Sequence, residues 1–200
     1  MDFSAIEQSH GNEPVLNLKK NDVLDLTKTD SSLKHLILGA GWDVPETGSS
    51  YDLDIAAFLL GENGRVNNPQ TDVVFFNNMK QQGICLNGDN RTGAGDGDDE
   101  QITIHTDELH PSVSRIVFVV TIYDAITKKQ MFGKVKNAYV RLLDMEQNER
   151  VLCRYPLTDD YSTETAMVFA EIEKTAGGWT FKAIGEGCHG DLNTLLSKYM

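Results

Sequence analysis

The sequence predicts a mainly β protein: a β-sandwich of two sheets with a few short peripheral helices. Three observations point to this fold. Apolar and polar residues alternate with a period of two in many short segments, turn-forming residues separate these segments, and helical periodicity is rare. The length of 200 residues suits one such domain.

Eight segments carry strand character. The segment 115–123 is almost continuously apolar, which predicts a central strand covered on both faces. In the segment 164–172, alternation predicts one face made of Ala166, Val168, Ala170 and Ile172 and an opposite face made of Met167 and Phe169. The predicted strands are 52–60, 72–76, 101–105, 115–123, 138–143, 150–157, 164–172 and 179–184.

One helix is predicted, over residues 191–199. Its four apolar residues stand at helical spacing, and Asp191 precedes them as an N-cap. Residues 106–112 are predicted to form one short turn that ends at Pro111. Residues 1–14 are polar and without pattern, so we expect a flexible N-terminal extension before a domain that spans 15–200.

Composition narrows the class of protein. Hydrophobic residues make up 40% and charged residues 24%, which is typical of a globular domain. The net charge of −12 disfavours binding to nucleic acid, because that binding depends on lysine and arginine. The aromatic residues on the strand patterns are interpreted as core: Trp42, Trp179, Phe58, Phe75, Phe118 and Phe169.

The cysteines and the N-terminus bear on location. Three cysteines without CxxC spacing argue against a disulfide framework or a zinc site and for a reducing compartment. The N-terminus does not resemble a signal peptide, and the apolar stretches are too short to span a bilayer. We therefore expect a cytoplasmic protein without a transmembrane segment.

The segment Gly88 to Glu100, GDNRTGAGDGDDE, is the strongest functional signal. It holds five acids, one base and four glycines. Two carboxylates 4 Å apart repel each other by about 1 kcal/mol even in water, so a compact cluster needs a positive charge to offset the repulsion. Calcium fits best, because it accepts six to eight oxygen ligands in flexible geometry and glycine-rich backbone can supply carbonyls. Magnesium uses fewer carboxylates, and no pair of His or Cys lies nearby to favour zinc.

The segment does not match other known loops. Arg91 occupies a position where an EF-hand needs an oxygen ligand, and GxxxxGK[ST] is absent. A second acidic element accompanies the loop. Asp52 and Asp54 are two apart on a predicted strand, so their carboxylates point to the same side. We expect this strand to complete the metal shell, with Asp43 at the same end of the sandwich.

These motifs together resemble the TerD family, the tellurium-resistance and general-stress proteins of bacteria. The resemblance covers about residues 15–200. It rests on GDNRTG followed by GDDE and, in chain order, on Gly41-Trp42-Asp43, Asp52-Leu53-Asp54, Val74 to Asn78, Phe132-Gly133, Arg154-Tyr155, Thr163 to Ala166 and Gly178-Trp179.

The resemblance implies a β-sandwich that binds calcium and acts in stress resistance by binding and assembly. Its partners would be other proteins of the tellurium-resistance gene cluster, at the inner face of the membrane. Carried over residue by residue, it implies metal ligands at Asp52, Asp54, Asp89, Asn90, Asp98, Asp99 and Glu100. The number of these oxygen donors predicts two calcium ions rather than one.

The main expectation is a protein without catalytic activity, and two alternative functions remain open. A metal-dependent phosphoester hydrolase would use the acids to hold metal and His105 or His35 as the base. Thiol-based detoxification of oxyanions would use Cys188, which stands next to His189. Cys85 and Cys153 fall within strand patterns, where we expect buried, inert thiols.

Overall fold

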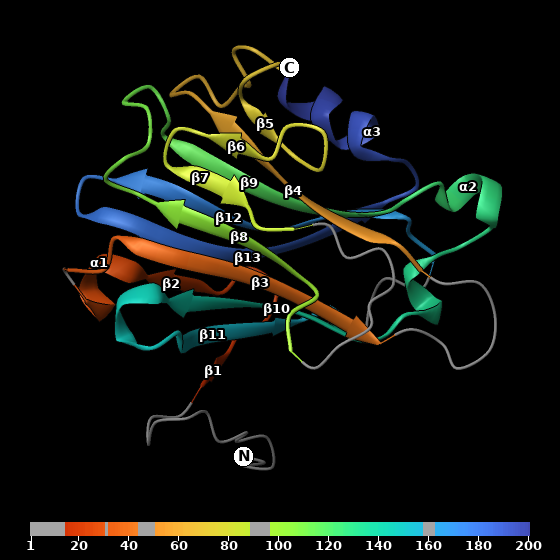
Figure 1. The fold of residues 1–200 in the computed structure, drawn as a ribbon, viewed down its shortest axis with the longest axis horizontal. Coiled ribbons are helices and arrows are strands. Elements are labelled where there is room, and N and C mark those ends of the chain that lie inside the picture. The colour runs from red at the N-terminus through yellow and green to blue at the C-terminus, as the bar shows by residue number, and fades with distance from the viewer. Residues whose placement is uncertain (1–14, 31, 44–50, 89–96, 158–162) are drawn as a thin grey trace.

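A computed structural model describes residues 15–30, 32–43, 51–88, 97–157 and 163–200 of the chain. The predicted extension 1–14 and most of the acidic segment, residues 89–96, lie outside the described residues. The two termini of the domain lie at different places on its surface, with helix α3 close to the C-terminus (Figure 1).

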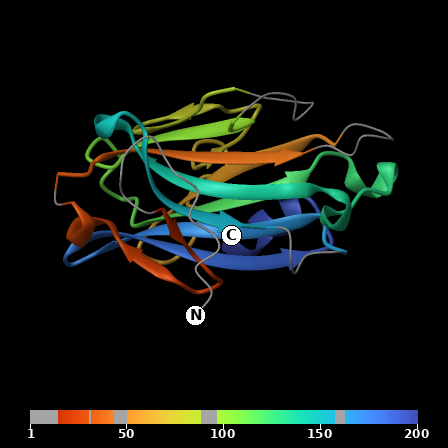
Figure 2. The ribbon, with the colours of Figure 1, turned by 90° about the horizontal axis from the view of Figure 1, so that it is seen from below.

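The described residues form two β-sheets that pack face to face, as the view along the layers shows (Figure 2). Sheet A has seven strands in the order β1-β11-β10-β3-β8-β7-β6, and sheet B has six in the order β2-β13-β12-β9-β4-β5. The predicted β-sandwich is confirmed.

The strands of sheet A are β1 (Leu16–Asn17), β3 (His35–Asp43), β6 (Lys80–Gln81), β7 (Ile84–Leu86), β8 (Glu100–His105), β10 (Lys136–Asp144) and β11 (Arg150–Pro156). Those of sheet B are β2 (Val23–Asp25), β4 (Leu53–Leu60), β5 (Val73–Val74), β9 (Arg115–Ile122), β12 (Ala166–Thr175) and β13 (Gly178–Cys188). The helices are α1 (Leu26–Thr29), α2 (Ala125–Lys128) and α3 (Leu192–Leu196), with 3-10 turns at Phe132–Lys134, Met145–Gln147 and Ser197–Tyr199.

The main core lies between the sheets. Strand β9 sits between β4 and β12, and its residues from Ile116 to Ile122 are buried on both faces, so the predicted central strand is confirmed. Phe118 and Phe169 stack within this core, with ring centroids 6.2 Å apart. Among the helices of the described residues, none is long and apolar enough to cross a bilayer.

The alternation predicted for β12 is wrong in its second half. Ala166 and Val168 share the outer face of sheet B, but Ala170 and Ile172 join Met167 and Phe169 in the core between the sheets. The cause is a register shift between Val168 and Ala170 that occurs against both neighbouring strands. A bulge inserts one residue and thereby exchanges the two faces of the strand beyond it.

The predicted C-terminal helix is present as α3 followed by a 3-10 turn, and the predicted cap is confirmed. The Asp191 side chain accepts a hydrogen bond from the Thr194 backbone N–H at 2.9 Å, within a capping box. Leu195 is fully buried and packs with Phe58 and Val168 on the outer face of sheet B. Sheet B is therefore covered on both sides in this region.

Candidate functional site

The predicted acidic ligands that the structure describes gather at one end of the sandwich. Asp54 lies near the start of β4, and Asp98 to Glu100 lead into β8. Asp43 ends β3 and joins them, because Ala40 of that strand pairs with Glu100. The predicted ligands Asp89 and Asn90 lie outside the described residues.

Asp98 is a buried anchor. Its side chain has 0% exposure, and its Oδ1 accepts a hydrogen bond from Arg141 Nε at 2.7 Å and another from the Tyr139 hydroxyl at 3.1 Å. Its Oδ2 accepts from Gln101 Nε2 at 3.1 Å. Protein donors therefore reach both oxygens of this carboxylate, which fixes the point where the acidic segment enters sheet A.

Two glycines of β3 make room for this arrangement. A Cβ added at Gly39 would collide with the Asp98 carboxylate, and one added at Gly41 would lie 2.6 Å from the Tyr139 hydroxyl. Across the strands, Gly39 pairs with Arg141 and Gly41 with Tyr139. The Asp98 carboxylate lies over Gly39, and the Tyr139 side chain lies over Gly41. Asp98 thus lies on the outer face of sheet A.

Tyr139 is held in its neutral form by this cluster. Burial and the nearby Asp98 charge raise the pKa of its hydroxyl to about 12. The Arg154 guanidinium stacks on the other side of the network, 4.2 Å from the centroid of the Tyr139 ring. A series of side-chain contacts therefore connects β11 and β10 to the start of β8; it runs from Arg154 to Tyr139, Asp98 and Arg141.

Asp99 extends the strand ladder with its side chain. Its backbone N–H donates to Ala40 O at 2.8 Å, and its Oδ2 accepts from the Trp42 backbone N–H at 2.9 Å. Burial raises the pKa of this half-buried carboxyl, and the negative charges of Asp98 and Asp43 raise it further. The Trp42 N–H partly offsets this rise in pKa, and three carboxylates lie close together at this end of β3 and β8.

Glu100 links the two sheets. It is 3% exposed, and its Oε2 accepts from the Ile55 backbone N–H of β4 at 2.8 Å. On that edge of β4, strand β5 pairs only with Ala57 and Phe58. The carboxylate therefore supplies a partner to a backbone donor beyond the end of β5, where a lost partner would be costly.

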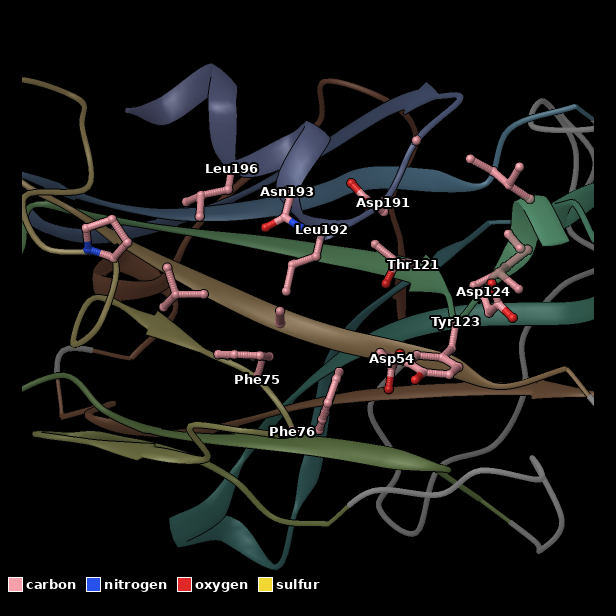
Figure 3. A pocket seen from close by; sticks show the side chains of 17 residues that line it. Asp54, Phe75, Phe76, Thr121, Tyr123, Asp124, Asp191, Leu192, Asn193 and Leu196 are labelled. Atoms are coloured by element: carbon pink, nitrogen blue, oxygen red, sulfur yellow. The ribbon is translucent and has the colours of Figure 1, made fainter.

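Asp54 lies elsewhere around this end. It alternates with the core residues Leu53 and Ile55, so it faces outward from sheet B, where it lines a pocket beside Thr121 and Tyr123 (Figure 3). The structure therefore places Asp54 and Asp98 on opposite outer faces of the sandwich. Asp52, half-buried, precedes β4, and its backbone carbonyl accepts from the Tyr123 N–H at 2.8 Å.

Within residues 15–30, 32–43, 51–88, 97–157 and 163–200, no three His, Cys, Asp or Glu side chains are grouped so as to hold a metal ion. The predicted ligands of the segment 89–96 lie outside the described residues. The predicted ligand set stays a prediction.

The bases proposed for hydrolysis lie at the other end of β8. His105 ends this six-residue strand, about 17 Å from its start at a strand rise of roughly 3.4 Å per residue. His35 stacks on it with ring centroids 4.4 Å apart, and each ring has a carboxylate neighbour: Glu146 for His35 at 3.1 Å and Glu108 for His105 at 3.3 Å. This placement does not favour water activation at the acidic end.

The cysteines differ in exposure. Cys153 is buried, and burial raises the pKa of its thiol to about 12, in agreement with the expected inert thiol. Cys85 and Cys188 are half-buried free thiols. Cys188 ends β13 and packs against the outer cluster of sheet B.

Sequence reasoning missed Arg141 and Tyr139, the partners of Asp98. Their spacing of two on a predicted strand places them on one face, and Gly39 and Gly41 have the same spacing. A paired search for these two patterns could have found the cluster. Arg91, the one base of the acidic segment 88–100, lies outside the described residues.

Known proteins resemble this chain over most of its length. A family model described as TerD domain matches residues 15–199. The tellurium resistance protein TerD of an Alcaligenes species is 43% identical over 187 residues, which cover 92% of this chain and 96% of that protein. General stress protein 16U of Bacillus subtilis (strain 168) is 38% identical over 188 residues, which cover 92% and 96%.

One solved structure supports the same relationship. The crystal structure of a homologue of telluride resistance protein (TerD) from Streptomyces coelicolor A3(2) has a TM-score of 0.68 with this chain at 26% sequence identity. The match covers 82% of this chain and 96% of that one.

Proposed function

Because the chain belongs to the TerD family of tellurium resistance and general stress proteins, we propose that it is a calcium-binding stress-response protein that acts by binding and assembly. The observation that supports the calcium proposal is the placement of the half-buried Asp99 carboxyl beside the acids Asp98 and Asp43 at the end of β3 and β8. Burial and the charges of Asp98 and Asp43 raise the pKa of this carboxyl. A divalent cation bound between these acids and the segment 89–96 would offset their mutual repulsion.

The described residues suggest different roles for the individual acids. The Asp98 side chain and Glu100 are buried and accept hydrogen bonds from protein donors, whereas Asp99 is half-buried, so we assign Asp98 and Glu100 to holding the two ends of the site in place. Asp99, with Asp89 and Asn90 from the sequence motif, would supply oxygens to calcium. Asp52 and Asp54 would serve the second of two ions, because Asp54 faces away from Asp98.

Calcium would act on the fold and on partners. A bound ion stabilises the folded protein by mass action and presents positive charge at a surface that is otherwise acidic. That charge would let a chain with a net charge of −12 contact a partner's carboxylates or phosphate headgroups at the inner face of the membrane. The partners proposed are other proteins of the tellurium-resistance cluster.

Thermal unfolding in calcium and in chelator tests the proposal. At a free calcium concentration one hundred times the Kd, one site contributes about 2.7 kcal/mol. For a domain of this size, that corresponds to a rise in Tm of about 5–10 °C. Magnesium at the same concentration should give a smaller rise, because it retains its waters.

Variants give the control. Asp99→Asn should reduce the calcium-dependent rise in Tm, while Asp107→Asn, a matched charge change near the histidines at the other end of β8, should leave it unchanged. If the wild-type Tm is equal in calcium and in chelator, the calcium proposal fails.

A further inference from the structure

The outer face of sheet B carries a pocket that the calcium proposal does not explain, since Asp54 is the one lining residue assigned above to an ion. Its volume is about 590 Å³, within the roughly 300–1,000 Å³ of small-molecule sites. Side chains reach it from β4 and β9, from the chain that follows β5, from α2 and from α3 (Figure 3). Four stretches of the chain, within 54–56, 69–76, 121–126 and 190–196, thus form one cavity.

Aromatic rings form one wall of this pocket. Phe75 and Phe76 meet edge to face with centroids 5.3 Å apart, and Phe76 meets Tyr123 in the same way at 6.1 Å. Leu192 and Leu196 of α3 line the pocket as well. Tyr123 keeps 51% of its surface exposed. Rings fixed in this geometry can bury the apolar body of a ligand at little cost in side-chain entropy.

The charged residues of the lining are all acidic. Asp54, Asp124 and Asp191 line the pocket, and the described lining residues include no Lys, Arg or His. Asp191 is engaged in capping α3. Asp124 is exposed, and its side chain makes no capping hydrogen bond to α2. Such a lining repels anionic ligands and attracts cations.

The Tyr123 ring already contacts a cation of the chain. Lys128, which is not among the lining residues, has its Nζ 5.2 Å from the centroid of this ring, a cation–π contact. The ring can therefore receive an ammonium group, and a ligand's ammonium would compete with that of Lys128.

We propose that this pocket binds a small organic cation. The ammonium group lies between Asp124 and the Tyr123 ring, and the apolar body lies between Phe76 and Leu192. This site goes beyond the proposed calcium function, because Asp124 and the aromatic wall are not among the expected metal ligands.

The test is a titration of the ¹⁵N-labelled full chain in chelator, so that its outcome does not depend on calcium. The probe is 2-phenylethylammonium, with neutral 2-phenylethanol and anionic 3-phenylpropanoate as matched comparisons. We expect binding of the cation at about millimolar concentration, with amide shifts at Leu192 and Asn193. The alcohol should bind about fivefold more weakly, and the anion more weakly still.

Variants locate the charge. Asp124→Asn should weaken cation binding about fivefold and leave the alcohol unaffected. Asparagine also tolerates the left-handed backbone of this position, where φ is 56°, so the fold is retained. Lys128→Gln should strengthen cation binding by removing the competing ammonium. Glu62→Gln, the same charge change at an exposed residue outside the pocket lining, should have no effect.

Three results would overturn the proposal. The first is equal affinity for the ammonium and the alcohol. The second is equal effects of Asp124→Asn and Glu62→Gln on cation binding. The third is the absence of amide shifts at Leu192 and Asn193 at a probe concentration of about 10 mM.

Discussion

Replacing Asp98 by Asn separates a structural carboxylate from a metal ligand. The substitution keeps the size of the side chain and an oxygen that can accept hydrogen bonds, but it removes the negative charge. Arg141 Nε, which lies 2.7 Å from Asp98 Oδ1, then faces a neutral amide. The Asp98 side chain is fully buried, whereas that of Arg141 keeps 28% exposure.

The magnitude follows from these exposures. Removing one partner of a fully buried ion pair costs about 3–5 kcal/mol, because the remaining charge is left uncompensated. Water reaches part of the Arg141 guanidinium, and the amide oxygen retains one hydrogen bond, so we expect a loss of about 2 kcal/mol. For a domain of this length, that lowers Tm by about 4–8 °C.

The assay is urea unfolding of the wild type, Asp98→Asn, Arg141→Gln and the double variant, each in chelator and in calcium. The loss should appear in chelator as well as in calcium, and the double variant should be less destabilised than the sum of the two single variants. The reasoning is refuted if Asp98→Asn unfolds like the wild type in chelator and differs from it only in calcium. Asp98 would then serve as a ligand and not as an anchor.

Three further predictions concern other residues of the fold. Glu100→Ala should destabilise the protein by about 2–4 kcal/mol in urea unfolding, because it leaves the Ile55 N–H without this acceptor and opens a cavity. Glu100→Gln keeps an acceptor and should cost clearly less. Equal losses in the two variants would contradict the role of Glu100 as acceptor for Ile55. In native protein at pH 8, Cys188 should react with a thiol reagent much faster than Cys153, because burial raises the pKa of the Cys153 thiol to about 12. Mass spectrometry after timed labelling measures the two rates, and faster labelling of Cys153 would contradict the prediction. The pKa of Tyr139 is raised from 10.0 to about 12 in the folded state, so its contribution to stability is complete below pH 10 and is lost as pH rises towards 12. Over that interval the stability of Tyr139→Phe should fall less than that of the wild type. Parallel stability profiles of the two proteins would contradict this prediction.

Much of the fold could be predicted from the sequence because most strands have one face in a core. Period-two alternation found β9 and its neighbours, and a capping residue found α3. Strand β3 was missed, although it lies at the centre of sheet A. Its Gly39 and Gly41 resemble strand breakers, yet they are needed where Asp98 and Tyr139 cross the sheet surface. Only the partner side chains, distant in sequence, explain those glycines.

The site was harder to predict because the sequence gives charges but not directions. The described acids lie at one end of the sandwich, but Asp54 does not face Asp98, as a shared metal shell would require. Their carboxylates then diverge: Asp98 turns to the outer face of sheet A, Glu100 bridges to Ile55 of sheet B, and Asp54 faces the pocket. These directions depend on strand register and on Arg141, which no local motif marks. The bulge in β12 was missed for the same reason, since no local residue pattern announced it.

Calorimetric titration of calcium into the metal-free chain should show saturable binding of two calcium ions. Asp99→Asn should weaken the site between β3 and β8, and Asp54→Asn should weaken the other, because these side chains lie at different places around the acidic end. Calcium titration without saturable heat in the wild type, or with both variants indistinguishable from it, would contradict the claim.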